Sequence, residues 1–247
     1  MSLLIEICVE GVDGAVAGER GGGDRIELCA SLVEGGITPS LATARAAVSA
    51  VRVPVCVMVR PRGGDFLYSP LEFASMRDDI LALKGTGAAG VVFGCLTPDG
   101  AVDEARTREL VETARPLTST FHRAFDMTAD AEAALEALIR CGVDRVLTSG
   151  QAANALDDLP LLRRLNAQAA GRIVVMGCGA LRPDSIARVR REAGLTELHF
   201  SAQAWAPSAM RYRNERLTMG GAAAEREYRL LTTDVDLVRA TIAAARA

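Results

Sequence analysis

The chain has 247 residues and a formal net charge of −3 at pH 7, with 49% hydrophobic and 24% charged residues. These values are typical of an ordinary soluble globular protein. The near-balanced charge, the lack of a basic run and the 4% aromatic content argue against nucleic-acid binding. No segment approaches the roughly 18 consecutive apolar residues of a membrane helix, so we expect no membrane association.

The cysteines and the first residues indicate a cytoplasmic protein. Six cysteines are scattered along the chain, most of them inside apolar runs, which is typical of reduced thiols packed as small hydrophobic groups. The opening sequence MSLLIEICVE carries acidic residues instead of the basic start of a secretory signal.

Apolar, β-branched runs alternate along the chain with Ala-, Leu- and Arg-rich segments of helical period. The predicted strands are 3–9, 25–29, 54–60, 90–95, 117–122, 144–149, 172–177 and 196–201. The predicted helices are 12–22, 40–52, 70–85, 102–114, 129–141, 155–170, 183–193 and 233–246, with 203–232 as an irregular stretch. The segments Thr38-Pro39-Ser40, Ser69-Pro70 and Arg182-Pro183 supply helix start signals.

Eight strand–helix units in about 250 residues predict a parallel α/β barrel of the (β/α)₈ or TIM-barrel type. We expect one domain that spans residues 1–247. A doubly wound sheet is the alternative, but CVEGVDGAVAG after the first strand matches a dinucleotide-binding glycine pattern only weakly.

Polar residues on the predicted strands share one face. Side chains alternate between the two faces of a strand, so Glu6 lies with Cys8, and Glu27 lies with Cys29. The valine-rich faces are expected to pack against helices, which turns the polar faces into the barrel. Further polar residues are expected on inward faces of other strands. The full inward-facing set is Glu6, Glu27, Arg60, His122 and His199. We expect this set near the carboxyl-terminal mouth, where barrel enzymes carry their chemistry.

Three segments after predicted strands add candidate binding residues. RPRGGDF offers Arg60 and Arg62 for a carboxylate or phosphate. FHRAFDM places Arg123 and Asp126 close to His122, which is a candidate general acid or base oriented by a carboxylate. MGCGA, with Gly177 and Gly179, occupies the usual position of a phosphate cradle, although a simple tight turn explains it equally well.

The residue types limit the chemistry of such a site. Lys84 is the only lysine and lies in a predicted helix, which argues against Schiff-base catalysis. No G-x-S-x-G nucleophile motif is present. Proton transfer of the lyase or isomerase type on a small phosphorylated or carboxylated molecule remains, with Glu6, Glu27, His122 and His199 as catalytic candidates.

The segments EIC, GGDRIELC, EGGITPS, RPRGGDFLYS, TFHRAFDM, RVLTSG and MRYRN closely resemble the CutC family, over nearly the whole chain. The resemblance implies a cytosolic TIM-barrel protein, a homodimer, and a link to copper homeostasis. It also implies that Cys8 and Cys29 are ligands of Cu(I). Cys178 in MGCGA departs from the small residue expected there.

Copper binding and catalysis therefore remain alternative hypotheses. Cu(I) prefers thiolate and thioether ligands, and Cys8, Cys29 and Met58 lie on adjacent predicted strands. No C-x-x-C spacing positions one ligand through the other. A harder divalent ion held by carboxylates and histidines is disfavoured by the nearby arginines, which suit a small anionic molecule better.

Overall fold

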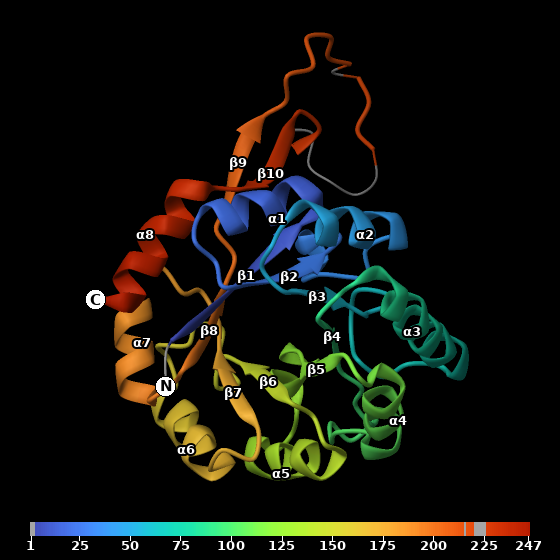
Figure 1. The fold of residues 1–247 in the computed structure, drawn as a ribbon, viewed down its shortest axis with the longest axis vertical. Coiled ribbons are helices and arrows are strands. Elements are labelled where there is room, and N and C mark those ends of the chain that lie inside the picture. The colour runs from blue at the N-terminus through green and yellow to red at the C-terminus, as the bar shows by residue number, and fades with distance from the viewer. Residues whose placement is uncertain (1–2, 215, 220–225) are drawn as a thin grey trace.

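Eight parallel strands close into a barrel in a computed structural model that describes residues 3–214, 216–219 and 226–247 (Figure 1). Each strand pairs with its neighbour in sequence, and β8 pairs with β1. The strands are β1 (Leu4–Glu10), β2 (Arg25–Cys29), β3 (Val55–Met58), β4 (Gly90–Phe93), β5 (Thr118–Phe121), β6 (Arg145–Thr148), β7 (Val174–Gly177) and β8 (Glu197–Phe200). The predicted TIM-barrel fold and strand order are confirmed.

The helices form a ring around the barrel (Figure 1). They are α1 (Gly11–Arg20), α2 (Leu41–Ala50), α3 (Pro70–Leu83), α4 (Glu104–Ala114), α5 (Ala131–Cys141), α6 (Leu159–Ala169), α7 (Ile186–Ala193) and α8 (Val235–Arg246). Short 3₁₀ turns lie at η1 (Leu32–Glu34), η2 (Lys84–Thr86) and η3 (Arg123–Met127).

The predicted helix starts at Ser40 and Ser69 are confirmed by their hydrogen bonds. The Ser40 hydroxyl accepts from the Thr43 N–H, and Ser69 forms a reciprocal capping box with Glu72. The predicted start at Pro183 is wrong, because a turn closed by the Ser185 hydroxyl precedes α7.

The stretch 203–232, predicted to be irregular, contains a two-stranded antiparallel sheet. Here β9 (Gln203–Pro207) pairs with β10 (Arg229–Thr233), and the pair projects from the barrel beyond α1 (Figure 1). The two strands are separated by a long connection, so no short turn signal marks them as a hairpin. The prediction also covers residues 215 and 220–225, which lie outside the described residues.

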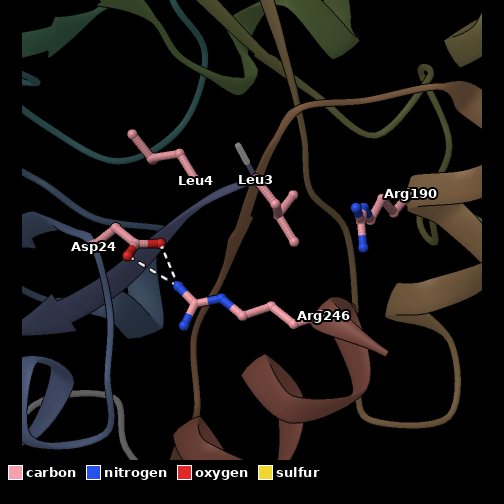
Figure 2. A pocket seen from close by; sticks show the side chains of 5 residues that line it. All are labelled: Leu3, Leu4, Asp24, Arg190 and Arg246. Carbon is pink, nitrogen blue, oxygen red and sulfur yellow. Dashed lines mark hydrogen bonds and ion pairs between the residues drawn. The ribbon is translucent and has the colours of Figure 1, made fainter. Parts of the chain in front are cut away.

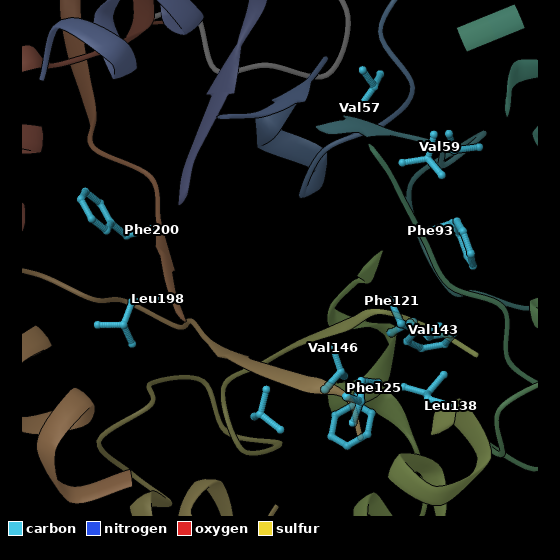
Figure 3. Packing of buried hydrophobic residues seen from close by; sticks show 14 of the residues in the cluster. Val57, Val59, Phe93, Phe121, Phe125, Leu138, Val143, Val146, Leu198 and Phe200 are labelled. Carbon is cyan, nitrogen blue, oxygen red and sulfur yellow. The ribbon is translucent and has the colours of Figure 1, made fainter. Parts of the chain in front are cut away.

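The two faces of the strands enter different environments. Val55, Val57 and Val59 of the third strand segment belong to the large apolar cluster between barrel and helices, part of which is drawn in Figure 3. Burial of such side chains stabilises the fold by about 1.5–3 kcal/mol each. Cys56 and Met58, from the alternate positions, pack inside the barrel. The face assignment made from strand parity is therefore confirmed.

Within the described part of the chain, we find no helix with the length and apolar character needed to cross a bilayer.

Candidate functional site

A layer of paired charges lies inside the barrel. The guanidinium of Arg25 binds both Glu6 and Glu197, with 2.6 Å between Arg25 Nη2 and Glu197 Oε2. Arg145 Nε lies 3.1 Å from the same Glu197 oxygen. Two arginines and two carboxylates offset one another, which reduces the cost of burying them.

Arg60, Arg62 and Arg123, the arginines that the sequence places after predicted strands, do not pair with these carboxylates. Arg25 and Arg145, which begin their strands, do so instead. Arg25 has the same strand parity as Glu27, and Glu6 is paired in register with Arg25. The parity was visible in the sequence, but the register was not.

Glu6 connects this charged layer to His199. The Nδ1–H of His199 donates to Glu6 Oε1 over 2.8 Å. Burial alone would raise the pKa of Glu6, but the hydrogen bond from His199 and the charge of Arg25 outweigh it and lower the pKa to about 2. Glu6 is thus an ionised carboxylate, and both of its oxygens accept hydrogen bonds. This arrangement suits the positioning of His199 better than it suits the transfer of a proton to or from Glu6.

Glu27 and His199 form a second, less tightly bonded pair. His199 Nε2 lies 3.8 Å from Glu27 Oε2. Burial raises the pKa of Glu27 above its usual value. Burial would lower the pKa of His199, but the carboxylates of Glu27 and Glu6 outweigh it and raise that pKa. The pair therefore retains a proton at neutral pH.

A cavity of about 90 Å³, here called the mouth cavity, adjoins this pair. Its lining includes Glu27, Met58, Arg60, Phe66, His122 and His199. Three buried polar atoms of these residues, Glu27 Oε1, Arg60 Nε and His122 Nε2, have no hydrogen-bond partner within the described chain. Buried polar atoms are nearly always satisfied, so these three atoms are candidate contacts for a ligand in the cavity.

His122 is a neutral hydrogen-bond donor. Its Nδ1 accepts from the Ala124 N–H over 3.2 Å, which places the proton of the neutral ring on Nε2. Burial and the charge of Arg60 lower the pKa of His122 to about 3. Asp126 does not orient His122, as the sequence had suggested, because Asp126 bonds elsewhere.

Arg60 brings a positive charge to the mouth cavity. Its guanidinium is buried and donates to three backbone carbonyls, at Glu34, Gly36 and Gly64. It also lies 5.0 Å from the centre of the Phe66 ring. No ion pair joins Arg60 to a carboxylate of the described residues, so its charge is not neutralised there.

Arg62 does not join this cluster. It pairs with Glu72 at 2.6 Å and Asp65 at 3.1 Å, on the outer side of the loop after β3. Its predicted role beside Arg60 is not supported by this placement, because its donors hold the loop together.

Arg123 and Asp126 lie together at the rim. Arg123 Nε is 2.8 Å from Asp126 Oδ2. Asp126 also accepts from the hydroxyls of Thr148 and Ser149 and from backbone N–H groups of the following loop. Asp126 therefore fixes the loop and the position of Arg123, and it has little capacity left to bind a ligand.

The two glycines of the MGCGA segment that the sequence singled out lie in different surroundings. A side chain at Gly177 would collide with Leu195 of the outer layer, so Gly177 permits close packing away from the mouth. Gly179, with φ of +98°, lines a second cavity of about 170 Å³, here called the loop cavity. The loop cavity shares Arg123 and His199 with the mouth cavity. Cys178 is buried between Leu147 and Met176.

Cys8 and Cys29 face each other with their sulfur atoms 4.0 Å apart. They pack with Cys56 and Met58 in a small sulfur-rich cluster. The contact with Cys29 and burial raise the pKa of Cys8. The contact with Cys8 would lower the pKa of Cys29, but burial and Glu27 raise it to about 11. Both are thiols at neutral pH.

One donor set in the described residues has the spacing of a metal site. Ligand atoms of Cys8, Glu27 and His199 lie within 4.8 Å of one another. The donor set thus overlaps both the sulfur cluster and the lining of the mouth cavity.

A larger hollow of about 540 Å³ lies at the opposite end of the barrel, where the strands begin (Figure 2). It is lined by Leu3, Leu4, Asp24, Arg190 and Arg246. Asp24 and Arg246 form an ion pair at 2.9 Å. The Asp24 carboxylate is already paired, so the described lining of this hollow lacks the unpartnered buried polar atoms of the mouth cavity.

Comparison with known proteins identifies the family. The model of the CutC family matches residues 3–204. A CutC family protein of Mesorhizobium japonicum is 61% identical over 244 residues, 99% of this chain and 95% of that protein. The "copper homeostasis protein cutC homolog" of Homo sapiens is 49% identical over 243 residues, 98% of this chain and 89% of that protein.

A solved structure is also similar. The crystal structure of a CutC protein from Streptococcus agalactiae superposes with a TM-score of 0.76 at 28% identity. The match covers 80% of this chain and 97% of that one. The chain therefore belongs to the CutC family.

Proposed function

We propose that this protein binds a small anionic molecule in the mouth cavity and transfers a proton within it. The observation that carries the proposal is the pair of buried, unpartnered atoms Glu27 Oε1 and His122 Nε2 on one cavity. A carboxylate and an N–H donor on the same small space suit a substrate that both loses a proton and gains negative charge on an oxygen.

The charges assign a role to each group. The raised pKa of Glu27 makes it a stronger base than an ordinary glutamate, and His199 beside it holds a proton. Neutral His122 would donate from Nε2 to the developing oxyanion, and the charge of Arg60 would stabilise that oxyanion. Glu6 acts as a positioning residue through its bond to His199.

Arg60 also favours an anionic substrate. A buried cation without a carboxylate partner is costly, and a bound anion would reduce that cost. Isomerase or lyase chemistry on a small phosphorylated or carboxylated carbonyl compound meets these requirements.

A ligand screen tests the binding step. Phosphorylated and carboxylated carbonyl compounds are added one at a time, and the free energy of unfolding is measured. A compound at 100 times its Kd adds about 2.7 kcal/mol. The variant His122→Phe keeps an aromatic ring beside Phe66 but lacks the donor, so we expect about tenfold weaker binding. Glu112→Gln, on an exposed part of α4, is the control. Equal binding by all three proteins, or no binding compound, would contradict the proposal.

Cu(I) binding by Cys8 and Cys29 is a second candidate function. It is favoured by the 4.0 Å separation of the sulfurs, which two metal–thiolate bonds of about 2.3 Å can bridge. The neighbouring Cys56 and Met58 add soft donors, and relatives are named for copper homeostasis. The raised thiol pKa values mean that binding must displace protons, so affinity should increase with pH.

Competition for Cu(I) tests this candidate. Reduced protein is titrated against a Cu(I) chelator, comparing wild type, Cys8→Ser/Cys29→Ser and the control Cys141→Ser. Cys141 lies on α5, away from the sulfur cluster. Loss of binding only in the double variant supports the site, and equal binding by all three excludes it.

The single domain over residues 1–247, the cytoplasmic location and the homodimer stay predictions. Analytical ultracentrifugation of the purified protein distinguishes a dimer from a monomer. Fractionation of the source cells tests the location.

A further inference from the structure

The loop cavity has the composition of an anion site. It lies between the loop after β7 and the end of β8, and Arg123, Arg182, His199 and Ser201 are among its lining residues. No acidic side chain lines it within the described chain. In TIM barrels, the loops after the seventh and eighth strands are a frequent position for phosphate groups.

The backbone of this loop adds unused donors. The N–H groups of Gly179, Ala180 and Leu181 have no acceptor among the hydrogen bonds of the described residues. Gly179 and Ala180 both have positive φ values, +98° and +53°. A left-handed conformation is uncommon for alanine, and successive N–H groups in such turns form concave anion sites.

The arginines are free to bind. The Arg182 side chain is exposed and makes no ion pair within the described chain. Arg123 uses Nε for Asp126 and Nη2 for Ser149 and Ala152, which leaves Nη1 without a partner in the described residues. Arg60 and Arg62, which the sequence suggested as anion ligands, have most of their donors bound to loop carbonyls and carboxylates.

We propose that the loop cavity is a phosphate subsite, formed by the amides of residues 179–181 with Arg123 and Arg182. Because it shares Arg123 and His199 with the mouth cavity, one short molecule can occupy both. Its phosphate lies over the loop, and its reacting carbon lies beside Glu27. The substrate class is thereby a small phosphate monoester. Only this assignment of the substrate class rests on the proposed function.

Inorganic phosphate is the probe that tests the subsite. Its Kd is measured by calorimetry at constant ionic strength, with chloride replacing phosphate in the reference. Arg182→Met removes an exposed side chain that holds nothing else in the described structure, so the fold should be retained. We expect about ten- to hundredfold weaker phosphate binding, the effect of losing a charge-assisted hydrogen bond.

Two further variants separate the outcomes. Arg45→Met, on the exposed face of α2, is the matched control and should bind phosphate as wild type does. Glu112→Gln, on the exposed part of α4, should also bind phosphate normally, because Glu112 does not line the loop cavity. Wild type that binds no phosphate, or equal weakening by Arg45→Met and Arg182→Met, would overturn the subsite. Failure of the proton-transfer proposal would leave the phosphate measurement unchanged.

Discussion

His199 on β8 donates from Nδ1 to Glu6 on β1 over 2.8 Å, at the seam where the last strand meets the first. The two residues are paired in register, so closure of the barrel itself creates the bond. The bond fixes the orientation of His199, whose other nitrogen faces Glu27. The link between the charged layer and the mouth cavity thus depends on complete folding.

Replacement of Glu6 should destabilise the fold strongly. Glu6→Gln removes one charge from a buried cluster and leaves Arg25 with only Glu197. Breaking a buried ion pair costs about 3–5 kcal/mol. Urea unfolding should show this loss for Glu6→Gln and a change below about 0.5 kcal/mol for the exposed control Glu112→Gln. Similar small effects in both would show that the pair contributes little.

The pH dependence of stability should contain a component from His122. Its pKa is about 3 in the folded state and 6.5 ordinarily, so below pH 6.5 the unfolded chain binds a proton that the folded chain does not. Stability therefore falls as the pH falls. From pH 7 to pH 5 this component amounts to about 2 kcal/mol.

The variant His122→Gln isolates that component. Its side-chain oxygen can still accept from the Ala124 N–H, but it does not titrate. Other groups, including His199, contribute to both proteins and cancel in the difference. The variant should lose about 2 kcal/mol less than wild type between pH 7 and pH 5. Identical profiles would mean that His122 is not held neutral.

The cysteines should be nearly inert in the folded protein. Burial raises the pKa of Cys56 and of Cys95 to about 12, and the remaining thiols are also shifted upward. Thiolate is the reactive form, so alkylation at pH 8 should be at least about a hundredfold slower than in urea. Mass spectrometry after a timed pulse of iodoacetamide measures this. A rapidly labelled Cys8 or Cys29 would instead indicate an accessible, activated thiol.

The cap of α3 should make a measurable local contribution. Ser69→Ala removes the acceptor for the Glu72 N–H and should cost about 1 kcal/mol. Ser49→Ala, at an exposed position within α2, is the control and should be neutral or slightly stabilising. Chemical denaturation of both variants gives the comparison. An equal effect at the two positions would rule out the cap as its cause.

The sequence was sufficient for the barrel and for the inward faces, because both follow from local periodicity. The roles of the arginines did not follow. Arg60 and Arg62 are close in sequence, yet one enters the barrel mouth and the other binds Glu72 on α3. An arginine pairs with the carboxylate that strand register and the path of the loop bring next to it, as Arg25 pairs with Glu6.

Other features depended equally on tertiary structure. The hairpin of β9 and β10 joins strands that are far apart in sequence. The tautomer of neutral His122 follows from the Ala124 N–H, which becomes a donor to the ring only when the chain turns into η3. Phe66, which contacts both Arg60 and His122, gave no signal of its own.

Hydrogen exchange from a substrate carbon tests the central claim most directly. Carbonyl compounds that stabilise the protein are incubated with it in D₂O, and loss of the C–H signal next to the carbonyl is followed by proton NMR. We predict exchange with wild type and with Cys8→Ser/Cys29→Ser, and at least about a hundredfold slower exchange with Glu27→Gln. Exchange that survives in Glu27→Gln, or stops only when the two cysteines are replaced, would contradict the account.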